Sequence, residues 1–173
     1  MGIAYYEAAV ATCDAELAAS GGRGVFDPAV EAQARGGLGA VLHIHGEEQQ
    51  RSLELLRQSV SLLRQAARTP PPGYSARDAK LALAIQLGNL GAMHIPHGLG
   101  AVLSFRLPNM GIMELQTFGR VHGGVVSSEG LAEAKACLRE ALELSEATDV
   151  DLKRATMANL AILSNQRPWS QPF

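Results

Sequence analysis

The sequence is poor in cysteine, in aromatic residues and in charge. Its two cysteines, Cys13 and Cys137, are too few for a disulfide framework or a four-ligand zinc site. Charged residues make up 18% of the 173 positions and hydrophobic residues 47%, which is not the composition of a disordered chain. The 15 basic and 17 acidic residues give a net charge of −2, which argues against nucleic acid as a partner. Because no disulfide framework is present, we expect a reducing compartment and a cytoplasmic protein.

The sequence also lacks a membrane-spanning segment and the short motifs of common enzymes. The stretch from Leu81 to Phe105 has no charged residue, but Gln86, Asn89 and Pro96 interrupt it, and polar groups are costly in hydrocarbon. No nucleophile elbow, Walker loop, metalloprotease motif or dinucleotide-binding glycine pattern is present. We therefore expect no membrane contact, no cofactor, no metal and no catalytic residues.

Alanine and leucine dominate the sequence, with 27 and 23 residues, and both favour the α-helix. Capping patterns mark two helix starts, since Asp27 precedes Pro28 and Ser75 stands three residues before Asp78. The prolines at 70–72 must end the helix before them. The sequence thus predicts an all-α fold, with helices over residues 3–19, 27–43, 47–68, 76–94, 129–147 and 151–164.

Two kinds of helix alternate along the chain. The segment Leu56–Leu62 is similar to Leu138–Leu144, which lies 82 residues further on, and this distance is twice a repeat of about 41 residues. A second set of similar segments lies near the middle of the other helices. It comprises Leu38-Gly39-Ala40, Leu90-Gly91-Ala92 and Leu160-Ala161-Ile162.

This alternation resembles the tetratricopeptide repeat, in which antiparallel helix pairs stack into a right-handed superhelix. In that family a Leu-Gly on the first helix of a pair lets the second helix approach closely, and small residues seven apart on the second helix pack back. The corresponding residues here are Asn89, Leu90 and Gly91 on a first helix and Ala134, Leu138 and Ala141 on a second. The resemblance implies one helical-repeat domain over residues 1–165, with an insertion at 96–127 and a C-terminal tail at 166–173.

The resemblance also implies a non-enzymatic scaffold for a protein or peptide partner, either an adaptor or a structural subunit of an assembly. The first helices of successive pairs would line a concave binding face. Asn89 and Asn159 occupy equivalent places on them, and in some family members such an asparagine holds the terminal carboxylate of a peptide. The alternative is that these asparagines only bridge backbone groups between helices. The candidate partner-binding residues on this face are Gln33, His43, Asn89, Asn159 and Asn165.

The interval from Gly91 to Ala134 is much longer than the family requires. It spans 43 residues, where the resemblance implies about a dozen. The excess, residues 97–127, contains large apolar side chains such as Leu103, Phe105 and Met113, so it is not a solvated linker. It is either an irregular functional insertion that packs across the helices or enters a partner, or non-coding sequence translated in frame.

The histidines indicate an alternative function, which is metal binding. Imidazoles are common ligands of zinc, copper and iron, so a small metal-binding protein or metal-dependent enzyme would use His43, His45, His94 and His97. The spacing from Gly37 to His43 resembles the cupin metal motif, but a helix rather than strands is expected around it. Histidines that end a helix also interact favourably with its carbonyl dipole, which is a purely structural role.

Apolar residues on the first and last predicted helices have no further helix to cover them. They are Ile3, Val10 and Leu17 on one and Leu152, Leu160 and Leu163 on the other. A single helix pair buries only part of its apolar surface, so neighbouring pairs must share a core. We therefore expect a part of a longer array, a partner docked at one end, or end-to-end self-association.

Overall fold

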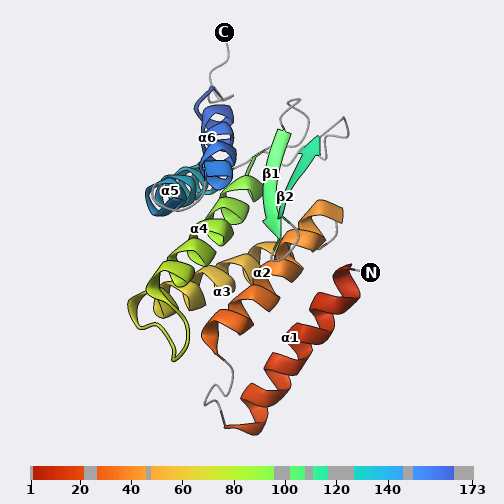
Figure 1. Cartoon of the computed structure of the whole chain (residues 1–173). Helices are drawn as coiled ribbons and strands as arrows, with labels where there is room; N and C mark the ends of the chain where they lie inside the picture. Colours follow the sequence, from red (N-terminus) through yellow and green to blue (C-terminus); the bar gives the residue numbers. More distant parts are fainter. Residues whose placement is uncertain are drawn as a thin grey trace.

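Six α-helices and one pair of strands make up the part of the chain that the structure describes (Figure 1). The computed structural model describes residues 2–21, 27–45, 48–95, 102–107, 111–116, 127–145 and 150–165. The elements are α1 (Gly2–Ala19), α2 (Pro28–His45), α3 (Gln49–Arg68), α4 (Ala76–Met93), β1 (Val102–Leu107), β2 (Gly111–Gln116), α5 (Ser128–Ser145) and α6 (Val150–Asn165). The predicted helical class is confirmed, and each of the six predicted helices is found with its ends within two residues of the expected positions.

Local side-chain chemistry fixes the starts of α2 and α4. Asp27 Oδ1 accepts a hydrogen bond from the backbone N–H of Ala29 at 2.8 Å, and Pro28 is the first residue of α2. Ser75 Oγ accepts one from the N–H of Asp78 at 3.0 Å and so caps α4. Both oxygens satisfy N–H groups that have no partner within the first helical turn. The two predicted caps are confirmed.

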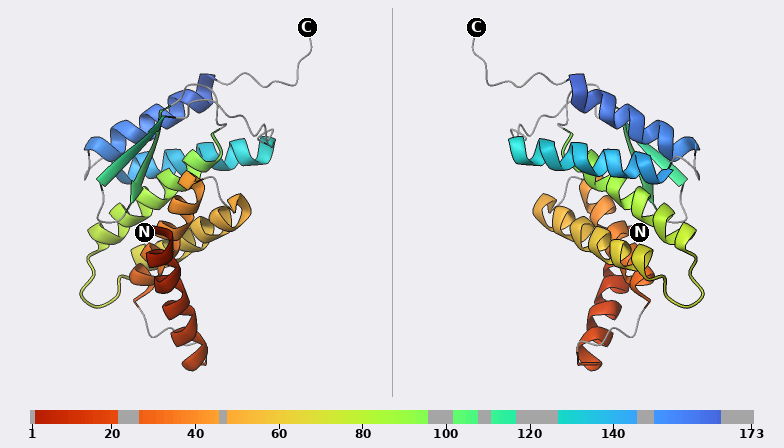
Figure 2. Two further views of the ribbon diagram at one scale, coloured as in Figure 1. Left: turned by 90° about the vertical axis from the view of Figure 1, so that its right-hand side faces the viewer. Right: turned by 90° about the vertical axis from the view of Figure 1, so that its left-hand side faces the viewer.

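Each helix contacts the next one along the chain, from α1 to α6 (Figure 1). In addition, α2 contacts α4, and α4 contacts α6. The three helices that carry the Leu-Gly or Leu-Ala segments therefore lie in a row. Figure 2 shows this row from two further sides, with α1 and α6 at opposite ends of the helical part.

Two glycines let neighbouring helices approach closely. A Cβ atom added at Gly39 of α2 would lie 2.9 Å from the backbone oxygen of Ser52 and 3.0 Å from Leu56 Cγ in α3. A Cβ added at Gly91 of α4 would lie 2.5 Å from Leu138 Cγ in α5. Such distances are too short for non-bonded carbon, so a side chain at either position would force the neighbouring helix outward. The close approach predicted at the Leu-Gly segments is present in both pairs.

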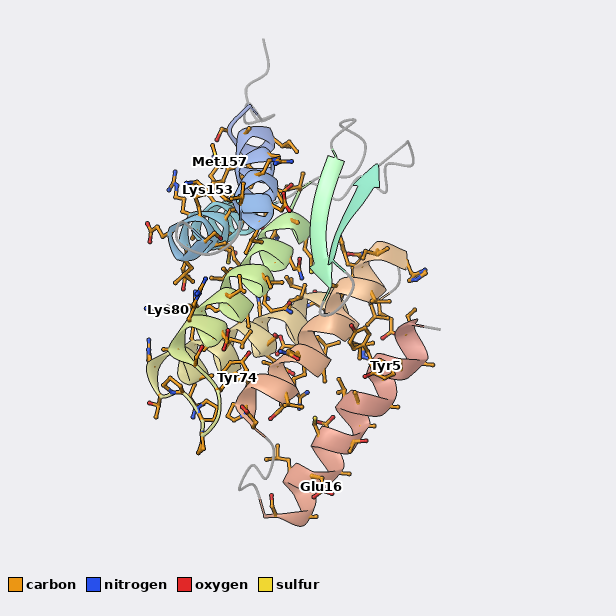
Figure 3. The ribbon with its side chains drawn as sticks, viewed as in Figure 1. Tyr5, Glu16, Tyr74, Lys80, Lys153 and Met157 are labelled. Atoms are coloured by element: carbon orange, nitrogen blue, oxygen red, sulfur yellow. The ribbon has the colours of Figure 1, made fainter. Side chains whose placement is uncertain are left out.

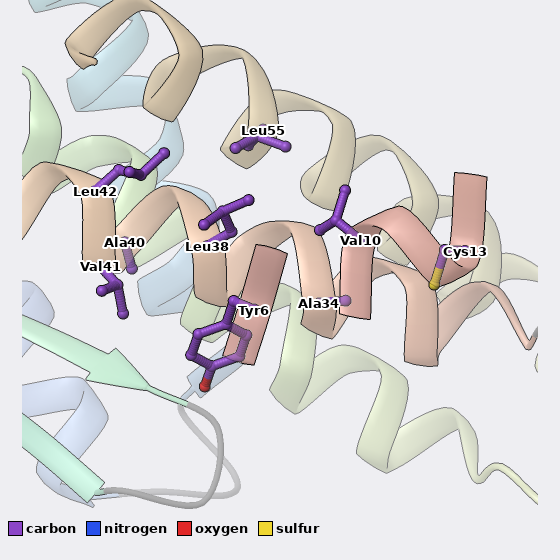
Figure 4. Packing of buried hydrophobic residues seen from close by; sticks show 9 residues of the cluster. All are labelled: Tyr6, Val10, Cys13, Ala34, Leu38, Ala40, Val41, Leu42 and Leu55. Atoms are coloured by element: carbon purple, nitrogen blue, oxygen red, sulfur yellow. The ribbon is translucent and has the colours of Figure 1, made fainter. Parts of the chain in front are cut away.

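Helix α2 has two further glycines that admit side chains from other helices. The ring of Tyr6 on α1 lies against Gly37, and the amide of Gln86 on α4 lies against Gly36, each where a Cβ atom would otherwise be. Figure 4 shows Tyr6 in one of the apolar clusters, together with Val10 of α1 and Leu38 of α2. Helix α2 thus meets α1, α3 and α4 through a different glycine each time.

Arg35 on α2 ties three helices together through polar contacts. Its Nε donates to Glu31 in the same helix at 2.9 Å, its Nη1 to Gln58 Oε1 of α3 at 3.1 Å, and its Nη2 to Asp14 of α1. The Arg35 side chain is only 12% exposed. Hydrogen bonds to charged groups gain strength where water is scarce, so this contact fixes α1 and α3 relative to α2.

Two strands lie within residues 96–127, which were predicted as an irregular insertion, while residues 96–101, 108–110 and 117–126 lie outside the described part of the chain. Strands β1 and β2 pair in antiparallel register, with Val102 opposite Gln116 and Leu107 opposite Gly111. β1 contacts α2, α4 and α6, and Figure 2 shows the strands beside α4 and α6. The sequence contains the signal for β1, because the apolar residues at 103, 105 and 107 alternate with polar ones, which is the period of a strand. Which of the alternatives for the insertion holds stays a prediction.

Candidate functional site

Three of the predicted partner-binding residues lie inside the molecule. His43 on α2, Asn89 on α4 and Asn159 on α6 are each 1% exposed. His43 Nδ1 lies 2.8 Å from Gln49 Oε1, and Asn89 Nδ2 donates to Gln86 Oε1 at 3.4 Å. Asn159 Oδ1 has no hydrogen-bond partner in the described part of the chain. A partner can reach these side chains only if the groups that cover them move, and their role in binding stays a prediction.

The other two predicted residues lie nearer the ends of their helices. Gln33 on α2 is half-buried, and its side chain hydrogen bonds with the hydroxyl of Tyr74, which lies before α4. Asn165 is the last residue of α6, and its side chain is outside what the structure describes. The structure therefore places the five predicted residues along α2, α4 and α6, the helices that β1 contacts, but does not join them into one open site.

An open groove of about 690 Å³ lies between α3 and α5. We call it the α3–α5 groove. Its lining residues are Arg57, Val60, Ser61, Arg64, Gln65, Arg68, Thr69, Leu90, Glu133, Ala136, Cys137 and Glu140. It combines apolar side chains with three arginines and two glutamates, and so offers both contact area and charge to a ligand.

Two arginine–glutamate pairs link α3 to α5 at this groove. Arg57 Nε and Nη2 donate to the two carboxylate oxygens of Glu133 at 2.9 and 2.6 Å. Arg64 repeats this arrangement with Glu140, at 3.2 and 2.5 Å. The arginines are seven residues apart and so are the glutamates, so the pairs lie two helical turns apart. Two-point contacts of this kind fix the lateral position of one helix against the other.

Arg68 lies in the same groove, one turn beyond Arg64. No carboxylate pairs with Arg68 among the described residues, in contrast to Arg57 and Arg64. Ser61 and Gln65 also line the groove and add hydrogen-bonding groups. The groove therefore has one positive charge more than it has negative charges, and this charge is available to an incoming carboxylate.

Burial and ion pairing shift the pKa values of three groups around the groove. Burial lowers the pKa of His94 below its ordinary value of 6.5, although Glu133 Oε2 lies 3.1 Å from its Nε2. The hydrogen bond from Arg57 lowers the pKa of Glu133. Burial raises the pKa of the Cys137 thiol to about 11. At neutral pH the imidazole is neutral, the carboxylate is charged and the thiol is protonated, so Cys137 is a poor nucleophile.

Acidification is expected to destabilise the protein through His94 and Glu133. Both pKa values are lower in the folded state, so the folded chain binds fewer protons than the unfolded chain when the pH falls below 6.5 for His94 and below 4.5 for Glu133. The stability from each group is present above those values and is lost as the pH falls through the folded-state pKa. Replacing His94 with glutamine should remove the part of the loss in unfolding free energy that begins near pH 6.5.

The measurement is the free energy of unfolding in urea at a series of pH values from neutral to acid. His45→Gln is the control for the change from histidine to glutamine, because His45 is exposed in the last turn of α2, and it should not remove the loss of stability assigned to His94. A profile for His94→Gln that follows the unmodified chain below pH 6.5 would contradict the role given to His94.

The histidines are not gathered into a metal site in the described part of the chain, where no group of three or more His, Cys, Asp or Glu side chains could hold an ion. His43 is buried and His45 exposed at the end of α2, and His94 contacts Glu133. His97 lies outside the described residues. The His43–His45 segment ends helix α2, as expected.

No family model matches the chain, and comparisons with curated proteins and with solved structures find no match either. Among the helices that the structure describes, none is long and apolar enough to cross a membrane. The tetratricopeptide resemblance therefore rests on the residues and contacts of the chain itself.

Two features of the site were missed in the sequence. The α3–α5 groove has a sequence signal, because Glu133 and Glu140 have the same seven-residue spacing as Arg57 and Arg64. Gln86 has no such signal, since its burial against Gly36 depends on how α4 meets α2.

Proposed function

We propose that this chain is a non-enzymatic protein-binding scaffold built from tetratricopeptide-like helix pairs, acting as an adaptor or as a structural subunit of an assembly. The observation that carries the proposal is a repeated contact, with Gly39 against Leu56 in one pair and Gly91 against Leu138 in the next. The sequence repeat aligns these two leucines. The side-by-side contacts of α2 with α4 and of α4 with α6 support it further, because stacked pairs share a core through such contacts.

The partner is proposed to be a protein segment that binds in the α3–α5 groove. The face that carries residues 33, 43, 89 and 159 is proposed to bind only when the strands are displaced, because β1 contacts all three of its helices. In the groove, Val60, Leu90 and Ala136 provide apolar contact, and Arg68 is placed to receive a carboxylate. Arginine suits this role because its guanidinium can donate two parallel hydrogen bonds to one carboxylate.

A photoreactive amino acid at Ser61, which lines the groove, tests this proposal. In an extract of the native source we expect one protein to be crosslinked reproducibly from Ser61. Arg68→Glu should reduce that crosslink about tenfold, which corresponds to about 1.4 kcal/mol, because it places a negative charge where a carboxylate would bind.

Arg139→Glu is the matched control for this experiment. Arg139 is an exposed arginine of α5 that does not line the groove, so the crosslink from Ser61 should survive its replacement. Equal loss of the crosslink in both variants would contradict the groove as the binding site. Turnover of a substrate by the purified chain, without any crosslinked protein, would contradict the scaffold function itself.

A further inference from the structure

The outer face of α6 corresponds to the faces of α2 and α4 that are covered by α3 and α5. Aligning the Leu-Gly segments places Ala161 of α6 at the position of Gly39 and Gly91. Those two glycines lie in close contact with the following helix, whereas Ala161 is exposed. Met157, four residues before Ala161, is 52% exposed, while the equivalent Leu87 of α4 is fully buried. Among the described residues, helix α6 therefore presents the face of a first helix without a second helix against it.

Helix α1 also has an exposed outer face. Tyr6, Val10 and Cys13 are buried against α2, and the opposite side of α1 is exposed. This outer face consists of Ala4, Tyr5, Ala8, Ala11, Thr12, Ala15 and Ala19, with Glu16 at its edge. It is apolar apart from Thr12, and the Tyr5 side chain on it is 71% exposed. A helix that is apolar on both sides is usually buried on both sides.

Large exposed apolar side chains are concentrated on these two helices. Among the described residues they are Tyr5, Val30, Val150 and Met157, and three of the four belong to the outer faces of α1 and α6. Figure 3 shows Tyr5 on α1 and Met157 on α6 at opposite ends of the helical part. Exposed apolar groups gathered on particular helices are a mark of interaction surfaces.

The charges of the two helices are complementary. All charged residues of α1 are acidic (Glu7, Asp14 and Glu16), whereas α6 carries Lys153 and Arg154 beside a single acid. Arg154 is 78% exposed, and its partner Asp151 lies 3.6 Å away in the same helix. Glu16 is exposed near the C-terminal end of α1, as Figure 3 shows. An antiparallel arrangement of α6 with α1 brings the N-terminal part of α6, with Arg154, to the last turn of α1, with Glu16, where the helix dipole also favours a cation.

We propose that the partner of each outer face is a second copy of this chain, with α6 of one copy packed antiparallel against α1 of the next. The inference rests on the alternating helix types of the proposed function, because α6 is of the first type and α1 of the second. The contact joins two different surfaces, so it is heterologous and leaves an unused face at each end of every dimer. Successive copies then add to an open series of helices, with Ala161 of one copy set against the alanines of the next.

Two exposed substitutions, one on each face, test this arrangement. Ala8→Glu blocks the α1 face and Ala161→Glu blocks the α6 face, while neither touches the core. The unmodified chain should show an average mass by light scattering that rises with concentration beyond that of a dimer. Each variant alone should remain monomeric. An equimolar mixture of the two should form a species of twice the monomer mass and nothing larger, because one intact α6 face then meets one intact α1 face.

Ala76→Glu is the control, since Ala76 is an exposed alanine in the first turn of α4. It should associate like the unmodified chain, and circular dichroism should show equal helix content in all variants. An unmodified chain that is monomeric at every concentration would overturn the inference, as would a mixture that stays monomeric. If a closed dimer persisted in one of the two variants, the contact would be symmetric, and this result would also overturn the inference. The crosslink from Ser61 depends on neither face, so its presence with a monomeric chain would leave the proposed scaffold function intact.

Discussion

Replacing Gly39 with valine is expected to lower the free energy of unfolding by about 3 kcal/mol. A Cβ atom there would lie 2.9 Å from the backbone oxygen of Ser52 and 3.0 Å from Leu56 Cγ. The first of these groups is main chain in the first turn of α3 and cannot rotate away. Helix α3 must therefore move outward, which opens the core that it shares with α2. Urea unfolding followed by circular dichroism measures the loss.

Gly88 of α4 is the matched control for that substitution. A Cβ atom added at Gly88 would meet one atom within 4 Å, Thr156 Oγ1 at 3.9 Å, which is an ordinary contact. Gly88→Ala should therefore stabilise the protein by about 0.5–1 kcal/mol, because alanine is the better helix former. Gly39→Ala should have the opposite sign despite the same chemical change. Equal effects of the two alanine substitutions would contradict the close approach of α2 and α3.

Replacing Leu138 with alanine is expected to cost about 3 kcal/mol of unfolding free energy, and Leu56→Ala about the same. Both side chains are fully buried, and each lies against a glycine of the helix before it. The lost apolar contact and the cavity left behind both contribute to the cost. Leu62→Ala is the control, because Leu62 is only half-buried on α3 and should lose much less.

A double substitution tests the contact between Gly91 and Leu138 directly. In the unmodified chain a Cβ atom at Gly91 would lie 2.5 Å from Leu138 Cγ, so Gly91→Ala should destabilise. In the Leu138→Ala background that Cγ is absent, and the new methyl group fills part of the cavity. We therefore expect Gly91→Ala to be neutral or stabilising there, with a coupling energy on the order of 1–2 kcal/mol between the two positions. Additive effects would contradict the contact.

The helices could be predicted from the sequence because their signals are local. Asp27 and Ser75 cap the helices that follow them, and the prolines at 70–72 separate α3 from α4. The Leu-Gly segments indicated a close helix pair, because a glycine in the middle of a helix weakens it unless a neighbour needs the space. The structure shows such neighbours, because Leu56 lies against Gly39 and Leu138 lies against Gly91.

The positions of the candidate binding residues could not be predicted in the same way. Asn89 and Asn159 lie on helices, α4 and α6, as predicted, but their burial depends on how α2, α4, α6 and the strands come together. No residue near Asn89 in sequence carries that information. The α3–α5 groove likewise depends on two helices whose paired residues are 76 positions apart, as for Arg57 and Glu133.

The connection from α4 to α5, which contains β1 and β2, is much longer than the connection from α2 to α3. Only three residues connect α2 to α3, whereas 34 connect α4 to α5, yet both pairs close around a glycine. Loop-closure entropy rises by about 0.6 kcal/mol for each doubling of length, so the longer connection costs about 2 kcal/mol more. One well-packed leucine offsets that amount. A change in the length of the connection after α4 therefore costs little in loop-closure entropy while the two helices stay joined.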